Sequence, residues 1–378
     1  MATLFEETAI NGMTMRNRMV RSATWEGMCD QDGRPTEKLA NCYRDLAQGG
    51  VGLIITGFTF IQQEGKALPG KMGIHTDDFA GDYEKLAHAV HEAGARIAVQ
   101  LVHAGGKASA KAAGRQPLAP SSVQDDQFPE IPAELTKDEI HEIVIAFGEG
   151  ARRAKAWGMD AVQLHGAHGY LINQFLSPHI NRRGDEYGGH IENRSRFLLQ
   201  VYQKVRDTVG ANFTVLIKLN ASDNLDGGLS IDDSLYAAKK LSGAGIDAIE
   251  VSAGTSASGD KNPAREKINK PEKEAYNLEM AVRIKEAVSC PVMVVGGFRS
   301  YEVAEKALQD NGMDYIAMAR PLIREPGLSN RWLRGDRSPA KCISCNSCFQ
   351  PAAKEGGLYC VIEKKEREKA AKAKGPIS

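Results

Sequence analysis

The feature that most constrains the fold of this chain is a regular alternation of short apolar segments with amphipathic helical segments. Each apolar segment is nearly uninterrupted, which is typical of parallel strands buried on both faces. Strands are expected at residues 18–23, 51–60, 96–102, 160–164, 213–219, 246–252, 290–295 and 315–319. Helices are expected at residues 79–93, 136–157, 230–242, 274–288 and 300–309. This rhythm predicts an α/β protein with a closed (β/α)8 TIM barrel.

The main alternative fold is an open, doubly wound sheet, which would place a glycine-rich fingerprint directly after the first strand. The sequence found there, SATW at 22–25, contains no glycine. Asn11-Gly12, within residues 5–18, is typical of a hairpin turn, and we expect this N-terminal hairpin to close the floor of the barrel. We therefore divide the 378 residues into a barrel domain, 1–335, and a Cys-rich C-terminal extension, 336–378, ending in a charged helix at 363–374.

The bulk composition is that of an ordinary soluble globular protein, with 42% hydrophobic and 25% charged residues. The formal net charge is zero, so no basic excess favours a nucleic-acid partner. The first residues, MATLFEETAINGM, lack the basic and apolar regions of a secretory signal. No apolar run approaches ~18 residues, so we expect no membrane-spanning helix and a cytoplasmic protein.

Polar side chains gather where the fourth predicted strand ends. His165, His168 and Tyr170 follow the apolar segment 160–164 within six residues. Active sites of such barrels lie at the carboxyl ends of the strands, so these side chains are expected in the active site. The alternative interpretation is a helix cap with two structurally satisfied histidines, which a lone histidine would favour but two histidines and a tyrosine do not.

Cysteines are concentrated at the end of the chain. Of the seven, Cys342, Cys345, Cys348 and Cys360 follow the pattern C-x2-C-x2-C-x11-C. An odd count and this crowding argue against a disulfide framework and for a metal site. Four thiolates at this spacing can hold a [4Fe–4S] cluster, and zinc would accept the same ligands. A cluster, a zinc ion and an empty vestigial site therefore all remain open.

The loops after the seventh and eighth predicted strands are suited to a phosphate. They contain Gly296-Gly297 and Ala319-Arg320, and barrels commonly bind phosphate at this place. Glycines let backbone N–H groups approach an anion, although paired glycines also form ordinary turns. Lys218 lies in the apolar segment 213–219, where an unpaired ammonium would be costly, so we expect a functional charge rather than a solvated strand residue.

The stretch at 165–194 resembles a known family. The matching motifs are HGAHGYL at 165–171, FLSP at 175–178, NRR at 181–183, DEYGG at 185–189 and ENR at 192–194. They resemble the Old Yellow Enzyme family of FMN-dependent ene-reductases, and the likeness extends over nearly the whole chain. It looks closest to the barrel domain of the branch that contains bacterial 2,4-dienoyl-CoA reductase and trimethylamine dehydrogenase.

The resemblance implies roles for particular residues. It implies that FMN contacts Ala23, Thr24, Gly57, Gln100, Lys218, Gly296, Gly297, Ala319 and Arg320. Most relatives carry arginine in place of Lys218, and Trp25 stands where one branch has a redox-tuning cysteine, so we expect the indole to shape the substrate pocket. His165 and His168 would bind the substrate oxygen, and Tyr170 would protonate the α-carbon. In this branch the cysteines hold a [4Fe–4S] cluster.

The implied function is an NAD(P)H-dependent oxidoreductase that transfers hydride from reduced FMN to the β-carbon of an activated C=C bond. The substrate would be a small unsaturated carbonyl compound. The alternatives are an N-demethylating amine dehydrogenase and a flavin and iron–sulfur subunit that relays electrons within a complex. An electron-transfer protein is a candidate partner, and self-association is left open. Multidomain relatives continue into a nucleotide-binding module, which we expect to be either a separate protein or absent here.

Overall fold

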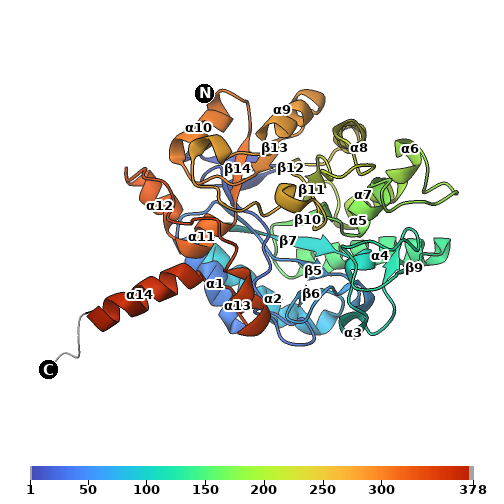
Figure 1. The fold of residues 1–378 in the computed structure, drawn as a ribbon, viewed down its shortest axis with the longest axis horizontal. Coiled ribbons are helices and arrows are strands. Elements are labelled where there is room, and N and C mark those ends of the chain that lie inside the picture. Colours follow the sequence, from blue (N-terminus) through green and yellow to red (C-terminus); the bar gives the residue numbers. More distant parts are fainter. Residues whose placement is uncertain (1, 374–378) are drawn as a thin grey trace.

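The centre of the molecule is a closed barrel of parallel strands (Figure 1). The computed structural model describes residues 2–373. The barrel strands in chain order are β3 (Met19–Arg21), β4 (Leu53–Ile55), β7 (Arg96–Val102), β10 (Ala161–Gly166), β11 (Thr214–Asn220), β12 (Ala248–Ser252), β13 (Val292–Val295) and β14 (Tyr315–Met318). Strand β14 pairs with β3, and β10 pairs with both β7 and β11, so the sheet closes on itself. The predicted (β/α)8 barrel is confirmed.

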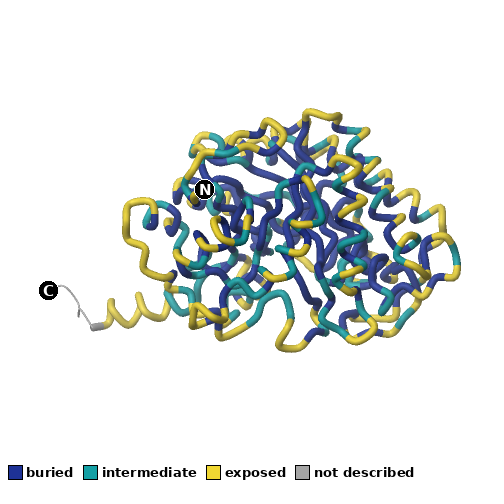
Figure 2. The backbone as a smooth tube through the Cα atoms, turned by 90° about the horizontal axis from the view of Figure 1, so that it is seen from above, coloured by how far each residue is buried: buried dark blue, intermediate teal, exposed yellow. Residues whose placement is uncertain are grey.

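Helices surround the strands as the alternation predicts. The outer helices are α1 (Glu37–Gln48), α2 (Ala80–Glu92), α4 (Lys137–Ala156), α7 (Arg196–Val209), α8 (Ile231–Gly243), α9 (Leu278–Ala287), α10 (Tyr301–Gln309), α11 (Arg320–Arg324) and α12 (Leu328–Leu333). The start of α4 is the expected capping box, because Glu139 N donates to Thr136 Oγ1 at 3.2 Å and Thr136 N donates to Glu139 Oε2 at 2.9 Å. Exposed residues lie mainly on the outside of the molecule, while its interior, which contains the strands, is buried (Figure 2).

The N-terminal hairpin closes one end of the barrel. Strands β1 (Thr8–Ile10) and β2 (Met13–Met15) pair antiparallel across Asn11-Gly12, whose φ angles of 44° and 78° a type I′ turn requires. Ile10, Met13 and Met15 pack in one apolar cluster with inward-facing residues of the barrel strands. The expectation that this hairpin plugs the floor is therefore confirmed, and the carboxyl ends of the strands stay open for a site.

Two segments differ in detail from the sequence prediction. The second predicted strand, 51–60, is broken into β4 and β5 (Thr59–Phe60), and β5 pairs with both β7 and β6 (Met72–Gly73). The break includes Gly57, where a Cβ atom would lie 2.6 Å from the backbone oxygen of Thr24, so a larger residue would displace the loop after β3. The helix expected from 274 begins at Leu278, because a short 3-10 helix, Pro271–Lys273, precedes it.

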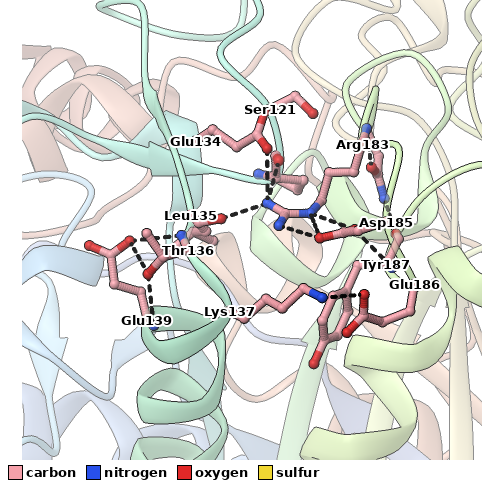
Figure 3. Close-up of polar contacts among 12 residues, drawn as sticks. Ser121, Glu134, Leu135, Thr136, Lys137, Glu139, Arg183, Asp185, Glu186 and Tyr187 are labelled. Carbon is pink, nitrogen blue, oxygen red and sulfur yellow. Dashed lines mark hydrogen bonds and ion pairs between the residues drawn. The ribbon is translucent and has the colours of Figure 1, made fainter.

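The long loop after β7 is held in place by the segment that carries the family-like motifs. Arg183 lies at the centre of these contacts (Figure 3). Its guanidinium donates to the carbonyl oxygens of Pro120 and Leu135 at 3.0 and 2.6 Å, and it pairs with Asp185 at 2.7 Å. These carbonyls flank β8 (Leu118–Ala119) and β9 (Ala133–Glu134). Arg183 and Asp185 therefore have a structural role, fixing two loops against each other.

The C-terminal segment returns to the open end of the barrel before it leaves the body. Helix α13 (Phe349–Lys354) packs so closely on the loop after β3 that a Cβ on Gly27 would lie 2.3 Å from Ala352 O. Helix α14 (Val361–Ala373) then projects away from the barrel (Figure 1). It corresponds to the predicted charged helix 363–374, of which Lys374 lies outside the described residues. Among the residues described, no helix has the length and apolarity needed to cross a membrane.

Candidate active site

One cavity opens at the carboxyl ends of the barrel strands. Most of the site residues predicted from the sequence line it together: Ala23, Thr24, Trp25, Gln100, His165, His168, Tyr170, Lys218, Gly297, Ala319 and Arg320. Gly57 and Gly296 lie outside the lining. Gly57 N donates to the Tyr43 hydroxyl at 3.0 Å. Residues far apart in the sequence are therefore brought to one place by the strand order of the barrel.

The two histidines and the tyrosine form a compact aromatic group on one side of this cavity. His165 belongs to β10, and Tyr170 is the N-cap residue of α5 (Leu171–Leu176). The ring centroid of His165 lies 5.3 Å from that of His168 and 4.9 Å from that of Tyr170, both in edge-to-face geometry. His165 Nδ1 is buried without a hydrogen-bond partner in the described structure. An unpaired buried nitrogen of this kind is suited to receive a ligand.

The position of His168 depends on an unusual backbone conformation. Its φ angle is 60°, in the left-handed region, which is unfavourable for a residue with a Cβ atom. Its Nε2 atom lies 2.7 Å from Ser252 Oγ at the end of β12, which holds the ring in place. Such strain is typical of functional sites, where the surrounding structure fixes a side chain in one orientation.

Burial sets the protonation states of this group. Burial, with further contributions from His168 and nearby lysines, holds the pKa of His165 well below its usual value. Burial, followed by Lys218 and Lys107, does the same to the pKa of His168. Burial also raises the pKa of Tyr170 to about 12. At neutral pH both imidazoles are therefore neutral and the phenol is protonated, so all three side chains can donate a hydrogen bond without carrying charge.

A buried polar network lies next to the histidines, because Lys218 on β11 is in register with His165 on β10. Lys218 Nζ is 3.2 Å from Glu250 Oε1 and 2.8 Å from Ser22 Oγ. Glu250 Oε2 accepts a hydrogen bond from Gln163 Nε2 at 2.7 Å, and Gln163 Oε1 accepts one from Gln100 Nε2 at 2.8 Å. Gln163 and Glu250 were missed by the sequence analysis. The signal that singled out Lys218, a polar residue inside an apolar strand, applies equally to both of them.

Two further lysines that the sequence analysis missed lie beside the aromatic group. Lys107 Nζ lies 4.9 Å from the ring centroid of Tyr170 and donates to His168 O at 3.1 Å. Lys71 lines the cavity and its Nζ lies 4.8 Å from the ring centroid of Trp25 and 4.6 Å from that of Phe58. Burial lowers the pKa of Lys71 to about 7 and that of Lys107 to about 8.

The end of the cavity formed by the loops after β13 and β14 is rich in arginine. Arg320 and Arg299 both line it, and Gly297 has a φ angle of 74°. A Cβ on Gly297 would lie 2.8 Å from the ring of Tyr276, so a larger residue would displace that side chain. Arg320 Nη1 donates to Asn346 Oδ1 at 2.7 Å, which ties this end of the cavity to the cysteine-rich segment.

The four predicted metal ligands meet beside α11. Cys342, Cys345, Cys348 and Cys360 line one small cavity together with Arg320 and Arg324. All are free thiols, and Arg324 Nη1 lies 3.9 Å from Cys360 Sγ. Across residues 2–373, however, no three His, Cys, Asp or Glu side chains are arranged closely enough to hold a metal ion. The structure thus gathers the thiols around one space without giving them the geometry of a formed metal site.

Comparison with known proteins identifies the class to which this fold and cavity belong. The model of the NADH:flavin oxidoreductase / NADH oxidase family matches residues 3–337. The chain belongs to this family, and its fold is that of Old Yellow Enzyme homologues. The resemblance seen in the sequence is confirmed at this level.

Two curated relatives match most of the chain. The NADH oxidase of Thermoanaerobacter brockii is 36% identical over 346 residues, which are 91% of this chain and 52% of that protein. The NADPH dehydrogenase of Geobacillus sp. strain WCH70 is 36% identical over 324 residues, which are 85% of this chain and 91% of that protein. The chain thus spans about half the length of the first relative and nearly all of the second.

Two solved structures are also similar to this chain over most of its length. 2-Naphthoyl-CoA reductase in complex with 2-naphthoyl-CoA superposes with a TM-score of 0.87 at 27% identity, covering 95% of this chain and 56% of the other. An Old Yellow Enzyme homologue from Zymomonas mobilis superposes with a TM-score of 0.77 at 29% identity, covering 90% of this chain and 94% of the other. The barrel fold is therefore shared with these proteins.

Proposed function

We propose that the protein reduces the activated C=C bond of a small unsaturated carbonyl compound. The observation that carries this proposal is the meeting of His165, His168 and Tyr170 on one side of the cavity, in protonation states that let each donate a hydrogen bond. FMN, when bound, supplies the hydride that is transferred to the β-carbon. The protein then has to bind the carbonyl oxygen, orient the alkene and deliver a proton.

The residues around the cavity fit FMN. The amide of Gln100 and the ammonium of Lys218 offer polar groups to the pyrimidine edge of the ring, where negative charge builds on reduction. Ala23 and Thr24 would contact the same ring from the end of β3. Gly57 acts indirectly, because a Cβ there would lie 2.6 Å from Thr24 O.

The phosphate of FMN would lie at the opposite, arginine-rich end of the cavity. Gly297, Ala319 and Arg320 line this end, and we assign them to the phosphate. Gly296 directly precedes Gly297 in the loop after β13 and lies outside the cavity lining, where it would help to form the phosphate-binding loop. The guanidinium of Arg320 supplies planar donors that suit an anion, and the buried position of this residue keeps those donors out of bulk water.

The histidine pair would bind the substrate oxygen, and the tyrosine would donate the proton. His165 and His168 would donate to the substrate oxygen, where negative charge develops as hydride reaches the β-carbon, which is oxyanion-type stabilisation. Because both imidazoles are neutral, each ring has one N–H group that can donate a hydrogen bond to this charge. Tyr170, held protonated by burial, would donate its proton to the α-carbon as a general acid. Trp25 lies on the same cavity and limits the shape of the substrate.

The amine dehydrogenase alternative is disfavoured by a specific contact. Recognition of an alkylammonium substrate requires aromatic rings around a cation. The rings available for this purpose, Trp25 and Phe58, already contact the ammonium of Lys71. A cationic substrate there would meet a like charge. The electron-relay alternative is disfavoured by the complete histidine and tyrosine group, for which a relay subunit has no use.

We further propose that Cys342, Cys345, Cys348 and Cys360 hold a [4Fe–4S] cluster. All four line one cavity, and the adjacent Arg320 and Arg324 favour thiolate ligands there. Such a cluster, when bound, transfers single electrons, so an electron-transfer protein is a candidate reductant beside NAD(P)H. Arg320 lines both this cavity and the proposed flavin site, which brings the two within contact of one side chain.

The test of the proposed function is turnover of a simple enone. Protein purified anaerobically should release FMN rather than FAD on denaturation, and should convert 2-cyclohexenone to cyclohexanone with NADH or NADPH. Detection of cyclohexanone by chromatography distinguishes reduction of the enone from oxidation of the nicotinamide without enone reduction. A flavoprotein that accepts electrons from NAD(P)H but forms no cyclohexanone, and instead oxidises a methylated amine, would contradict the proposal.

A further inference from the structure

A buried ammonium without a counter-ion lies on the substrate side of the cavity. Lys71, directly before β6, is 4% exposed and lines the cavity between the rings of Trp25 and Phe58. Phe58 in turn packs edge-to-face on Tyr170, with ring centroids 5.1 Å apart. Lys71 therefore lies across one aromatic ring from the proposed proton donor.

Three other lysines, Lys218, Lys107 and Lys66, all have hydrogen-bond acceptors. Lys218 pairs with Glu250 at 3.2 Å, and Lys107 donates to Ser256 Oγ and His168 O. Lys66, which also lies over a phenyl ring, donates to a backbone carbonyl oxygen. Within residues 2–373, Lys71 Nζ makes neither a hydrogen bond nor an ion pair.

The carboxylate that attracts the ammonium of Lys71 already has another ion-pair partner. Glu26 contributes a Coulombic attraction to Lys71, but its ion pair is with Arg21, at 3.6 Å between Nη2 and Oε1. Burial lowers the pKa of Lys71 to about 7, so an anion in contact with it would be needed to keep it charged at neutral pH. Burying a cation without such a partner is costly, and aromatic faces compensate for only part of this cost.

We propose that Lys71 binds a carboxylate of the substrate, at a site separate from the histidine pair that binds the activating carbonyl. The proposal rests on the ene-reductase function and narrows its substrates to unsaturated carbonyl compounds with an anionic group remote from the alkene. Trp25 and Phe58 would flank the apolar part of such a molecule. The burial of Lys71 favours a compact carboxylate over a phosphate carried on a long arm.

The test compares two substrates that differ in one charge, 4-carboxycinnamaldehyde and its amide analogue, 4-carbamoylcinnamaldehyde. The FMN-loaded enzyme should prefer the carboxylate in kcat/KM. Lys71→Met should lower this preference by about 10- to 100-fold, as expected for loss of one charge-assisted hydrogen bond. Lys71→Arg should retain most of the preference. The matched control is Lys66→Met, which removes a buried lysine outside the cavity lining and should leave the preference unchanged.

A binding measurement separates this proposal from the proposed reaction. The change in flavin absorbance should report tighter binding of 4-acetylbenzoate than of 4-acetylbenzamide, neither of which contains a reducible alkene. If neither aldehyde is reduced but Lys71→Met still abolishes this difference in Kd, the ene-reductase function is wrong and the carboxylate site stands. The role of Lys71 would be overturned if Lys71→Met weakened kcat/KM or binding equally for the carboxylate and the amide compound of a pair. It would also be overturned if the variant left the values for both compounds unchanged.

Discussion

Lys218 Nζ lies 3.2 Å from Glu250 Oε1, and both side chains are almost completely buried beneath the proposed flavin site. The two residues are in register on adjacent strands, β11 and β12. The cation expected beside the flavin is therefore part of an ion pair and not an isolated charge. Burial lowers the pKa of Lys218, and Glu250 opposes this effect, so the carboxylate helps to keep the ammonium charged.

This pairing predicts a strong dependence of stability on each partner. Lys218→Met leaves the Glu250 carboxylate buried without its cation and should lower the free energy of unfolding by about 3–5 kcal/mol. The double variant Lys218→Met/Glu250→Gln should recover at least half of that loss, because no charge is then left unpaired. Urea unfolding of the flavin-free proteins measures both. Strictly additive losses in the double variant would mean that the two side chains are not energetically coupled.

The cavity lined by Cys342, Cys345, Cys348 and Cys360 predicts a metal content that elemental analysis can measure. Anaerobically prepared protein should contain about four irons per chain and absorb broadly beyond the flavin bands, as a [4Fe–4S] cluster requires. Cys345→Ser should remove the iron while FMN stays bound. Cys290→Ala, which alters a cysteine outside this cavity, should keep the iron. One zinc per chain in place of iron would make the segment a structural clasp without a role in electron transfer.

The protonation states predict a flat pH profile for the step that reduces the enone. Tyr170 is active as the protonated phenol, and its pKa of about 12 means that this form is lost only in strong base. The pKa values of His165 and His168 are well below their usual range, so both rings stay neutral down to mildly acidic pH. Rapid mixing of reduced enzyme with 2-cyclohexenone between pH 6 and 9 should give a constant rate. A decline centred between pH 7 and 8.5 would contradict this and would point to Lys71 or Lys107, whose pKa values are about 7 and about 8, as the group on which the rate depends.

The fold could be predicted because barrel strands are buried on both faces and therefore leave uninterrupted apolar runs. The site at their carboxyl ends follows from the same architecture, so His165, His168, Tyr170 and Lys218 could be located from local sequence. Glu250 and Gln163 carry the same signal, a polar residue inside an apolar strand, but the sequence does not show which residue lies beside each of them on the neighbouring strand. Pairing becomes evident only when the register of β10, β11 and β12 is known.

Lys71 and the geometry of the cysteines could not be predicted from the sequence. Lys71 lies in an irregular segment whose path depends on contacts with Trp25 and Phe58, which are distant in sequence, so no periodicity marks it. The cysteine spacing predicts the ligand type but leaves cluster and zinc open, because both require the same thiolates. Gly57, which the resemblance places among the flavin contacts, lies outside the cavity lining, and its N–H donates to the hydroxyl of Tyr43 in α1.

The central claim, that Tyr170 supplies a proton during reduction of a C=C bond, is tested most directly by measuring the two half-reactions of Tyr170→Phe separately in a stopped-flow instrument. This change removes the hydroxyl and keeps the ring that packs on Phe58 and His165. Reduction of the flavin by NAD(P)H should proceed at nearly the normal rate, while oxidation of the reduced flavin by 2-cyclohexenone should slow by about 10²–10⁴-fold. Equal slowing of both half-reactions, or no slowing of either, would contradict the account.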